Sequence, residues 1–366
     1  MILAGDVGGT KAVIALCDNS GGPVRTPGAA SEGVRGATPV RTPGAASEGV
    51  RGATPVRVIR EAEFPCASYA SLAAILDEFL AGPVALDGAC FGVAGPVAGG
   101  TAKITNLPWT IAEAELSARL GGAPVTLLND LQATALGVLA MPPEAFATLQ
   151  APSAPPPPDA TIAVIAPGTG LGEALLVSDR GRYRALPSEG GHADFAPGTD
   201  EELALFRFLR GRHGPHVSNE RVLSGAGIGA LYDFARASRG DSEPRPAWLA
   251  KVADRNAAIS GAALADRDAD SVHAMALFAT ILGAEAGNMA LRAFATGGVV
   301  IGGGIPPKIL PLLQTGALVE RFNAKGRFAP WLRSLAVRVI LEPRAALLGA
   351  AHHAATHAVP HPQKAP

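Results

Sequence analysis

Apolar positions in the first part of the chain fall into short runs bounded by glycine or charged residues. The runs over residues 1–9 and 11–18 flank a glycine-rich turn and predict a β-hairpin. A further strand is predicted over 56–64, an amphipathic helix over 69–82 and a buried strand over 85–95. The opening order is therefore β-β-β-α-β.

The rest of the chain continues this alternation and then restarts it. A helix over 111–122 and a strand over 124–128, followed by Asn129 and Asp130, complete the first lobe. After a proline-rich stretch, residues 161–186 repeat the opening order of strand, glycine turn and strand. The remaining predicted elements are helices over about 199–238 and 245–295, a strand and turn over 297–307, a strand over 335–342 and a last helix from Arg344.

The length of 366 residues exceeds the ~250–300 residues beyond which one core usually divides. We expect a small α/β domain over 1–130, completed by a C-terminal helix at about 345–356, and a large α/β domain over 131–344. Residues 24–55 are two identical copies of one Pro-, Gly- and Ala-rich unit, which are too few to stack as a solenoid and predict a surface loop. Residues 357–366 are expected to form a flexible tail.

Composition narrows the possible functions. Apolar residues make up 48% of the chain and charged residues 17%, as in a soluble enzyme. With 31 basic and 32 acidic residues and no long run of one sign, neither nucleic acid nor a membrane surface is expected as a partner. No apolar window is long enough to span a bilayer, and the start lacks the pattern of a signal peptide. The three cysteines show no CxxC spacing and fit the reducing cytoplasm, so we expect a cytoplasmic protein with a small ligand.

Glycine-rich turns after strands let backbone N–H groups approach phosphate, and the sequence contains several. The stretch GDVGGTKA does not match a P-loop, because Thr10 stands where the second glycine is required and Ala12 follows Lys11. The stretches GTGLGE and GAGIGA lack the sixth-position glycine of a dinucleotide-binding turn. Neither of these two nucleotide-binding classes fits.

The order D-x-G-G-T-K, G-T-G and G-G-G-I-P resembles that of the actin, hexokinase and heat-shock ATPase superfamily. The resemblance implies two ribonuclease-H-like lobes with a central cleft, in which the turns hold ATP and Asp6 binds Mg²⁺ through water. The nucleotide-binding residues implied in this way are Asp6, Gly8, Gly9, Thr10, Lys11, Gly168, Thr169, Gly170, Gly302, Gly303 and Gly304.

The motifs LLND, SEGGHADFAPG and ERVLSGAGI resemble bacterial glucokinases of the hexokinase type over nearly the whole chain outside 24–55. The resemblance implies a homodimer that phosphorylates glucose at its 6-hydroxyl with ATP, as in glycolysis, with Asp130 as the general base of an in-line transfer. A neutral polyol requires paired hydrogen-bond donors and acceptors. The glucose-binding residues implied are Asn106, Asn129, Glu189, His192 and Glu220.

Several of these residues have a second interpretation. Asn106 can be a turn residue, Glu220 a helix-entry charge, and Asp130 a cap of the following helix. The spacing of Glu189 and His192 also occurs in metal-binding helices, but the two glycines between them favour a loop.

Other functions remain open at this point. A kinase for another hexose or an amino sugar would share every motif, and ATP, ADP or polyphosphate could be the phosphoryl donor. A ROK-like sugar-responsive regulator is disfavoured, because no cysteine cluster follows His192 and the first strand begins near Ile2, without room for a helix-turn-helix.

Overall fold

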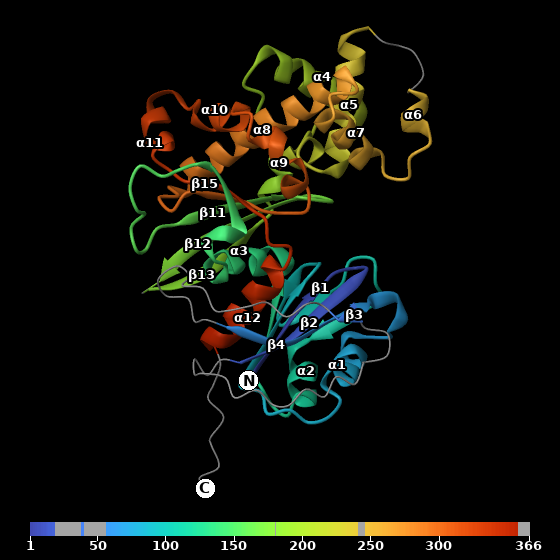
Figure 1. Ribbon diagram of the computed structural model, residues 1–366, viewed down its shortest axis with the longest axis vertical. Helices are drawn as coiled ribbons and strands as arrows, with labels where there is room; N and C mark the ends of the chain where they lie inside the picture. Colours follow the sequence, from blue (N-terminus) through green and yellow to red (C-terminus); the bar gives the residue numbers. More distant parts are fainter. Residues whose placement is uncertain (19–37, 40–55, 180, 241–245, 358–366) are drawn as a thin grey trace. The chain divides into compact units, whose positions relative to one another are not determined.

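The computed structural model is shown in Figure 1. The predicted tail after residue 357 and most of the predicted surface loop over 24–55 lie outside the described residues. Within that loop, Thr38–Pro39 form a short strand, β3, which pairs antiparallel with β4 (Arg57–Pro65). The described residues are 1–18, 38–39, 56–179, 181–240 and 246–357.

The chain forms two compact units. Unit 1 comprises Met1–Ala145, Gly181–Ala185 and Glu342–Pro366, and unit 2 comprises Phe146–Arg180 and Leu186–Leu341. Unit 1 extends past the boundary expected at residue 130, because helix α3 (Asp130–Ala140) packs on the C-terminal helix α12 (Ala345–His357). A helix that buries its apolar side in one unit belongs to that unit's core.

Unit 1 is built on a sheet in the order β3-β4-β2-β1-β5-β9. The hairpin strands β1 and β2 pair antiparallel, as do β2 and β4, whereas β1, β5 and β9 run parallel. All six residues of β5 are buried, as expected for a central parallel strand. The remaining bounds are β1 (Ile2–Val7), β2 (Lys11–Asp18), β5 (Gly88–Val93) and β9 (Val125–Asn129), with a small separate sheet of β6 (Val97–Ala98), β7 (Thr101–Lys103) and β8 (Thr110–Ala112).

Helices cover both faces of this sheet (Figure 1). On one face, α1 (Leu72–Leu80) and α2 (Glu113–Arg119) share a core with Leu3 and Val7 of β1. On the other face α12 packs on β1 and β5. Because side chains alternate along a strand, Asp6 lies on the face opposite Leu3 and Val7. The helix predicted over 111–122 is shorter than expected, since its first residues form β8 and pair with β7.

Helices α3 and α12 approach each other closely through two glycines. A Cβ atom at Gly349 would lie 1.8 Å from the carbonyl oxygen of Ala133, and one at Gly137 would lie 2.1 Å from that of Ala345. Only glycine permits this backbone contact. The crossing fixes α3, whose first residue is Asp130, against the C-terminal helix.

Unit 2 contains a sheet in the order β10-β15-β14-β11-β12-β13. Strands β11 and β12 form an antiparallel hairpin, and β11, β14 and β15 run parallel. The edge strand β10 pairs antiparallel with β15 and was not predicted, because its sequence lacks a clear alternation. The bounds are β10 (Phe146–Gln150), β11 (Ile162–Pro167), β12 (Leu171–Asp179), β13 (Arg182–Ser188), β14 (Val299–Ile301) and β15 (Val337–Ile340).

The core of unit 2 lies between this sheet and a helical layer around α8 (Ala269–Ala293). α8 is the one described helix long and apolar enough to cross a membrane, but 78% of its apolar window is buried inside the protein, as in a core helix. The long helices predicted over 199–238 and 245–295 are each divided into shorter ones. The other helices are α4 (Asp200–His213), α5 (Gly225–Ser238), α6 (Ala247–Ala250), α7 (Arg255–Leu264), α9 (Leu310–Leu313), α10 (Ala317–Asn323) and α11 (Ala329–Arg333).

The two sheets repeat one topology. In unit 1, β4, β2 and β1 are followed by the parallel strands β5 and β9, and in unit 2 the corresponding order is β13, β12, β11, β14 and β15. Each sheet therefore starts from a hairpin with a glycine turn and continues with parallel strands. This confirms the prediction of two ribonuclease-H-like α/β lobes.

Candidate active site

The first glycine turn joins β1 to β2. Gly8 donates its N–H to the carbonyl oxygen of Lys11 at 2.9 Å, which closes the turn. A Cβ atom at Gly9 would lie 2.7 Å from the carbonyl oxygen of Thr105, so this position accepts only glycine. Thr10 is exposed. The backbone at Gly8 and Gly9 thus carries no side chain, as close approach of phosphate requires.

Lys11 follows the turn as the first residue of β2. Its Nζ pairs with Oε2 of Glu63 at 2.8 Å, and the side chain remains 60% exposed. An exposed ion pair of this kind contributes little to stability and is easily exchanged for another partner. Lys11 therefore stays available to a phosphate group.

Asp6 lies near the end of β1, beside the first turn. Burial first, and then the charge of Asp130, raise the pKa of Asp6 to about 6, while Lys11 opposes this shift. Two neighbouring carboxylates repel each other, and a cation between them or beside them relieves the repulsion. The described residues contain no group of three or more His, Cys, Asp or Glu side chains suited to a metal. The carboxylate of Asp6, with that of Asp130 nearby, is a donor set that fits Mg²⁺. This ion usually binds one or two carboxylates together with retained waters and phosphate oxygens.

The strand β9 ends at Asn129, whose side chain caps helix α3. Its Oδ1 accepts a hydrogen bond from the N–H of Leu131 at 3.0 Å, and its Nδ2 donates to the carbonyl oxygen of Gly95 at 3.2 Å. Gln132 completes a capping box by accepting the N–H of Asn129 at 3.2 Å. Asn129 therefore fixes the strand-to-helix turn, and its amide oxygen still has one lone pair to offer.

Asp130 is the first residue of α3, and the cap is Asn129. The interpretation of Asp130 as the helix cap is therefore wrong. Its Oδ1 accepts the N–H of Leu131 at 2.8 Å, yet the side chain remains exposed. The surrounding protein partly desolvates the carboxyl group and this raises the pKa of Asp130, against the effect of hydrogen bonds from Leu131 and Asn129. A carboxylate that is exposed and has a raised pKa takes up a proton more readily than an ordinary one, so Asp130 is suited to act as a general base.

The register of the parallel strands brings the unit 1 residues together. Val7 of β1 pairs with Val93 of β5, and Val93 pairs with Asn129 of β9. The carboxyl ends of these strands thus meet at one edge of the sheet. The predicted residues gathered at this edge are Asp6, Gly8, Gly9, Asn129 and Asp130.

Asn106 joins this edge through a turn. It has a left-handed backbone with a φ of 65°, a conformation that Asn adopts more readily than most residues. Its Cβ lies 3.7 Å from the Cβ position of Gly9, and its side chain is exposed. The turn role is real, and the free amide can also bind a ligand.

The second glycine turn joins β11 to β12 in unit 2. Gly168 donates its N–H to the carbonyl oxygen of Gly170 at 2.8 Å. Glu220 fixes the same turn, because its Oε2 accepts the N–H of Leu171 at 3.0 Å. Thr169 lies exposed at the tip. Glu220 therefore contacts the glycine turn between β11 and β12 directly, and it is not simply a solvated charge at the start of a helix.

The third glycine turn, Gly302–Gly304, follows β14 and packs against the end of β11. Gly302 donates its N–H to the carbonyl oxygen of Ile165 at 2.8 Å. Gly303 has a φ of 86°, and a Cβ there would lie 2.3 Å from the carbonyl oxygen of Pro167. Because Pro167 immediately precedes Gly168, the second and third turns are neighbours in unit 2.

The segment Glu189–His192 forms a short loop on β12. A Cβ atom at Gly191 would lie 2.1 Å from the carbonyl oxygen of Leu171, so the loop backbone rests directly on the strand. The side chain of Glu189 is 90% exposed and that of His192 59%, with Nε2 of His192 3.9 Å from Oε2 of Glu189. Two exposed polar side chains on a backbone held by glycines form a suitable surface for hydroxyl groups.

Two residues of these sites were not found from the sequence. Gln132 stands three residues after Asn129, the spacing of a capping box, and this signal could have revealed it. Glu173, which lies beside the Glu189–His192 loop, is a charged residue within an apolar strand. That break in the pattern was its only sequence signal.

The repeated topology and the glycine turn in each hairpin define the actin-like ATPase fold, the class to which sugar kinases of this kind belong. A solved glucokinase from an Antarctic psychrotroph is 29% identical, with a TM-score of 0.78 over 97% of this chain and 98% of its own. A ROK family glucokinase from Streptomyces griseus, solved in complex with glucose and AMPPNP, has 19% identity and a TM-score of 0.56 over 97% of this chain and 99% of its own, and shares the fold.

Sequence comparison is more specific. A family profile described as Glucokinase matches residues 43–357. The glucokinase of Nostoc punctiforme is 36% identical over 96% of this chain and 98% of its own length. The chain belongs to the glucokinase family, as its motifs predicted.

Proposed function

We propose that the protein transfers the γ-phosphoryl group of ATP to the 6-hydroxyl of glucose. The observation that carries this proposal is the meeting of Asp6, the first glycine turn and Asp130 at one sheet edge of a glucokinase-family chain. A phosphoryl-transfer site needs a phosphate cradle, a metal-binding carboxylate and a base for the acceptor hydroxyl. Unit 1 supplies a candidate for each.

Asp130 acts on the acceptor hydroxyl. Its carboxylate orients the 6-hydroxyl and accepts its proton as the bond to phosphorus forms. The capping box of Asn129 and Gln132 holds the start of α3, and thereby the backbone of Asp130, in place. The other hydroxyls are bound by the remaining lone pair of the Asn129 amide oxygen, by the exposed side chains of Asn106, Glu189 and His192, and by Glu220.

The nucleotide is held by the glycine turns. The N–H groups of Gly8 and Gly168 close the two turns, and the backbone N–H groups of Gly9, Thr10, Thr169 and Gly170 bind the phosphates. Gly302–Gly304 lie near the adenosine. Lys11 exchanges Glu63 for a phosphate oxygen. Asp6 would hold Mg²⁺ through water, and the metal would supply positive charge that screens the transferred phosphoryl group. The nucleotide analogue in the Streptomyces griseus structure supports ATP as the donor.

Three further features belong to this proposal. The protein works in the cytoplasm, as its cysteines and composition favour. It acts as a homodimer, and its product enters glycolysis. Neither a nucleic acid nor a membrane takes part.

A panel of sugars and donors tests the proposed activity. Product formation should be measured with glucose, other hexoses and amino sugars, each with ATP, ADP and polyphosphate. Glucose with ATP should give the highest kcat/KM. A higher value for an amino sugar, or sugar binding without phosphorylation, would replace the proposal with one of the alternatives.

A further inference from the structure

Glu173 is a buried acidic residue with no part in the roles assigned above. It lies on β12, three residues after Gly170, and is only 3% exposed. It pairs with Ile165 of β11, and its neighbours Leu171 and Ala174 are buried and apolar. A carboxyl group in such surroundings costs free energy unless it is neutral or paired.

Glu173 contacts the loop that carries two of the proposed sugar-binding residues. A Cβ atom at Gly190 would lie 2.0 Å from Oε2 of Glu173, so the carboxyl group supports the loop backbone without an intervening side chain. The N–H of Gly190 is already bonded to Oγ of Ser188 at 2.9 Å and does not neutralise the carboxylate. Any movement of the carboxyl group is therefore passed to the backbone between Glu189 and His192.

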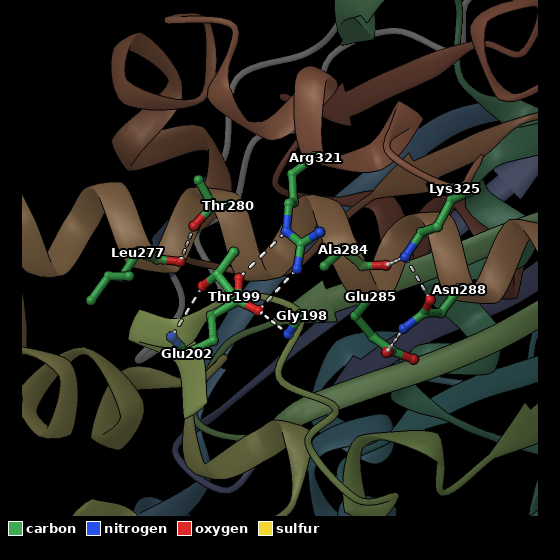
Figure 2. A network of polar contacts seen from close by, with 10 residues as sticks. All are labelled: Gly198, Thr199, Glu202, Leu277, Thr280, Ala284, Glu285, Asn288, Arg321 and Lys325. Atoms are coloured by element: carbon green, nitrogen blue, oxygen red, sulfur yellow. Dashed lines mark hydrogen bonds and ion pairs between the residues drawn. The ribbon is translucent and has the colours of Figure 1, made fainter. Parts of the chain in front are cut away.

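The other side of Glu173 faces a charged network on α8. Burial first, and then the charge of Glu285, raise the pKa of Glu173 to about 7, while Arg292 opposes this. Nη1 of Arg292 donates to Oε1 of Glu285 at 2.8 Å. Nδ2 of Asn288 donates to Oε2 of Glu285 at 2.9 Å, and Lys325 donates to Oδ1 of Asn288 at 2.6 Å (Figure 2). Among the described residues, no donor contacts Oε1 of Glu173.

We propose that Glu173 is a positioning residue for the sugar-binding loop, and that its neutral form holds Glu189 and His192 in the geometry that binds glucose. This role rests on the proposed function. When Glu173 loses its proton to solvent, its charge repels that of Glu285 in a poorly solvated environment. The carboxylate lies directly against Gly190 and cannot move toward the loop without displacing it.

The charges around Glu173 set the direction of each effect. Glu285 from α8 favours the neutral form of Glu173. Arg292 from α8 favours the ionised form of Glu173. Lys325 contacts the same network through Asn288. The affinity for glucose is therefore expected to fall as the pH rises through about 7.

The test is the pH dependence of KM and kcat for glucose in the wild type and in Glu173→Gln, which mimics the neutral carboxyl group. Between about pH 6 and about pH 9, the KM of the wild type should rise by about tenfold, since small displacements of binding groups have effects of this order. The kcat at saturating glucose should change much less. The KM of Glu173→Gln should stay constant, and a wild-type profile in this variant would overturn the role.

Two further variants keep the test decisive if Glu173→Gln does not fold. Glu285→Gln should move the midpoint of the KM profile to lower pH, and Arg292→Gln should move it to higher pH, because their charges act on Glu173 with opposite signs. Unmoved midpoints, or shifts in the same direction, would contradict the inference. Glucose affinity measured by calorimetry without nucleotide should follow the same profile.

The two proposals can fail separately. Glucose phosphorylation with a pH-independent KM would overturn the role of Glu173 and leave the proposed function standing. Absence of glucose phosphorylation at every pH would overturn the proposed function, and a pH-independent calorimetric affinity would then overturn the role of Glu173 as well.

Discussion

Replacing Asp130 with Asn separates proton transfer from structure. The start of α3 is capped by Asn129 and Gln132, and both remain in this variant. The amide oxygen of Asn can still accept the N–H of Leu131, which the carboxylate accepts at 2.8 Å. We therefore expect the free energy of unfolding to change by no more than about 0.5 kcal/mol, the range of substitutions that leave such features intact.

The chemical effect of Asp130→Asn should be large. An amide cannot take the proton of the 6-hydroxyl, and a positioned general base contributes about 10²–10⁴ in rate. This corresponds to about 3–5 kcal/mol of transition-state free energy, at 1.36 kcal/mol for each factor of ten. Glucose affinity should stay within about tenfold, because an acceptor oxygen remains. The pKa of Asp6 should fall, since the charge of Asp130 is one of the causes that raise it.

The assay couples glucose 6-phosphate formation to a dehydrogenase, with glucose affinity and melting temperature measured on the same preparations. Asp200→Asn is the matched control, because Asp200 is likewise the first residue of a helix after its cap, in α4. It should keep wild-type turnover. Turnover of Asp130→Asn within about threefold of the wild type, where the base predicts a loss of at least about 10², would refute the assignment of the base.

The remaining predictions concern the metal, the loop and the buried carboxyl group. Asp6→Ala should weaken the apparent affinity for ATP with Mg²⁺ and lower turnover, but calorimetric glucose affinity without nucleotide should stay near wild type, and its collapse would contradict the metal role. Deleting residues 24–39 leaves one copy of the repeat and should change activity and melting temperature little, because a twofold change in loop length costs only about 0.6 kcal/mol; a loss of activity beyond about tenfold would contradict the loop interpretation. Glu173 has a folded pKa of about 7 against an ordinary value of 4.5, so the folded state keeps a proton that the unfolded state releases, and stability falls as pH rises through this window. Glu173→Gln should therefore raise the free energy of unfolding by up to about 3 kcal/mol at pH ~8 and change it little at pH ~4, whereas equal effects at both values would argue against a titrating Glu173.

The sequence predicted the order of elements well, because hydrophobic period and glycine turns are local signals. The hairpin of β1 and β2 and its repeat in β11 and β12 follow from apolar runs that flank glycines. Boundaries that depend on packing were less accurate. Helix α3 belongs to unit 1 because Gly137 and Gly349 allow it to contact α12, and this contact spans more than two hundred residues of sequence.

The features of the candidate site are likewise of two kinds, those that local sequence signals predict and those that depend on three-dimensional packing. Motif positions such as Asp130 and Gly168–Gly170 could be read from their spacing. Contacts made in three dimensions could not, among them the bond from Asn129 to Gly95 and the support of Gly190 by Glu173. These contacts depend on strand register and loop packing, which a single sequence does not encode locally.

The most direct test of the central claim is the identity of the product formed by the purified wild-type protein from glucose, ATP and Mg²⁺. Phosphorus NMR of the reaction should show one new phosphate monoester on the 6-oxygen of glucose, formed in equal amount to ADP. Its rate should fall by about 10²–10⁴ in the Asp130→Asn protein under the same conditions. Release of inorganic phosphate without a sugar phosphate, or a phosphate on another hydroxyl, would contradict the account.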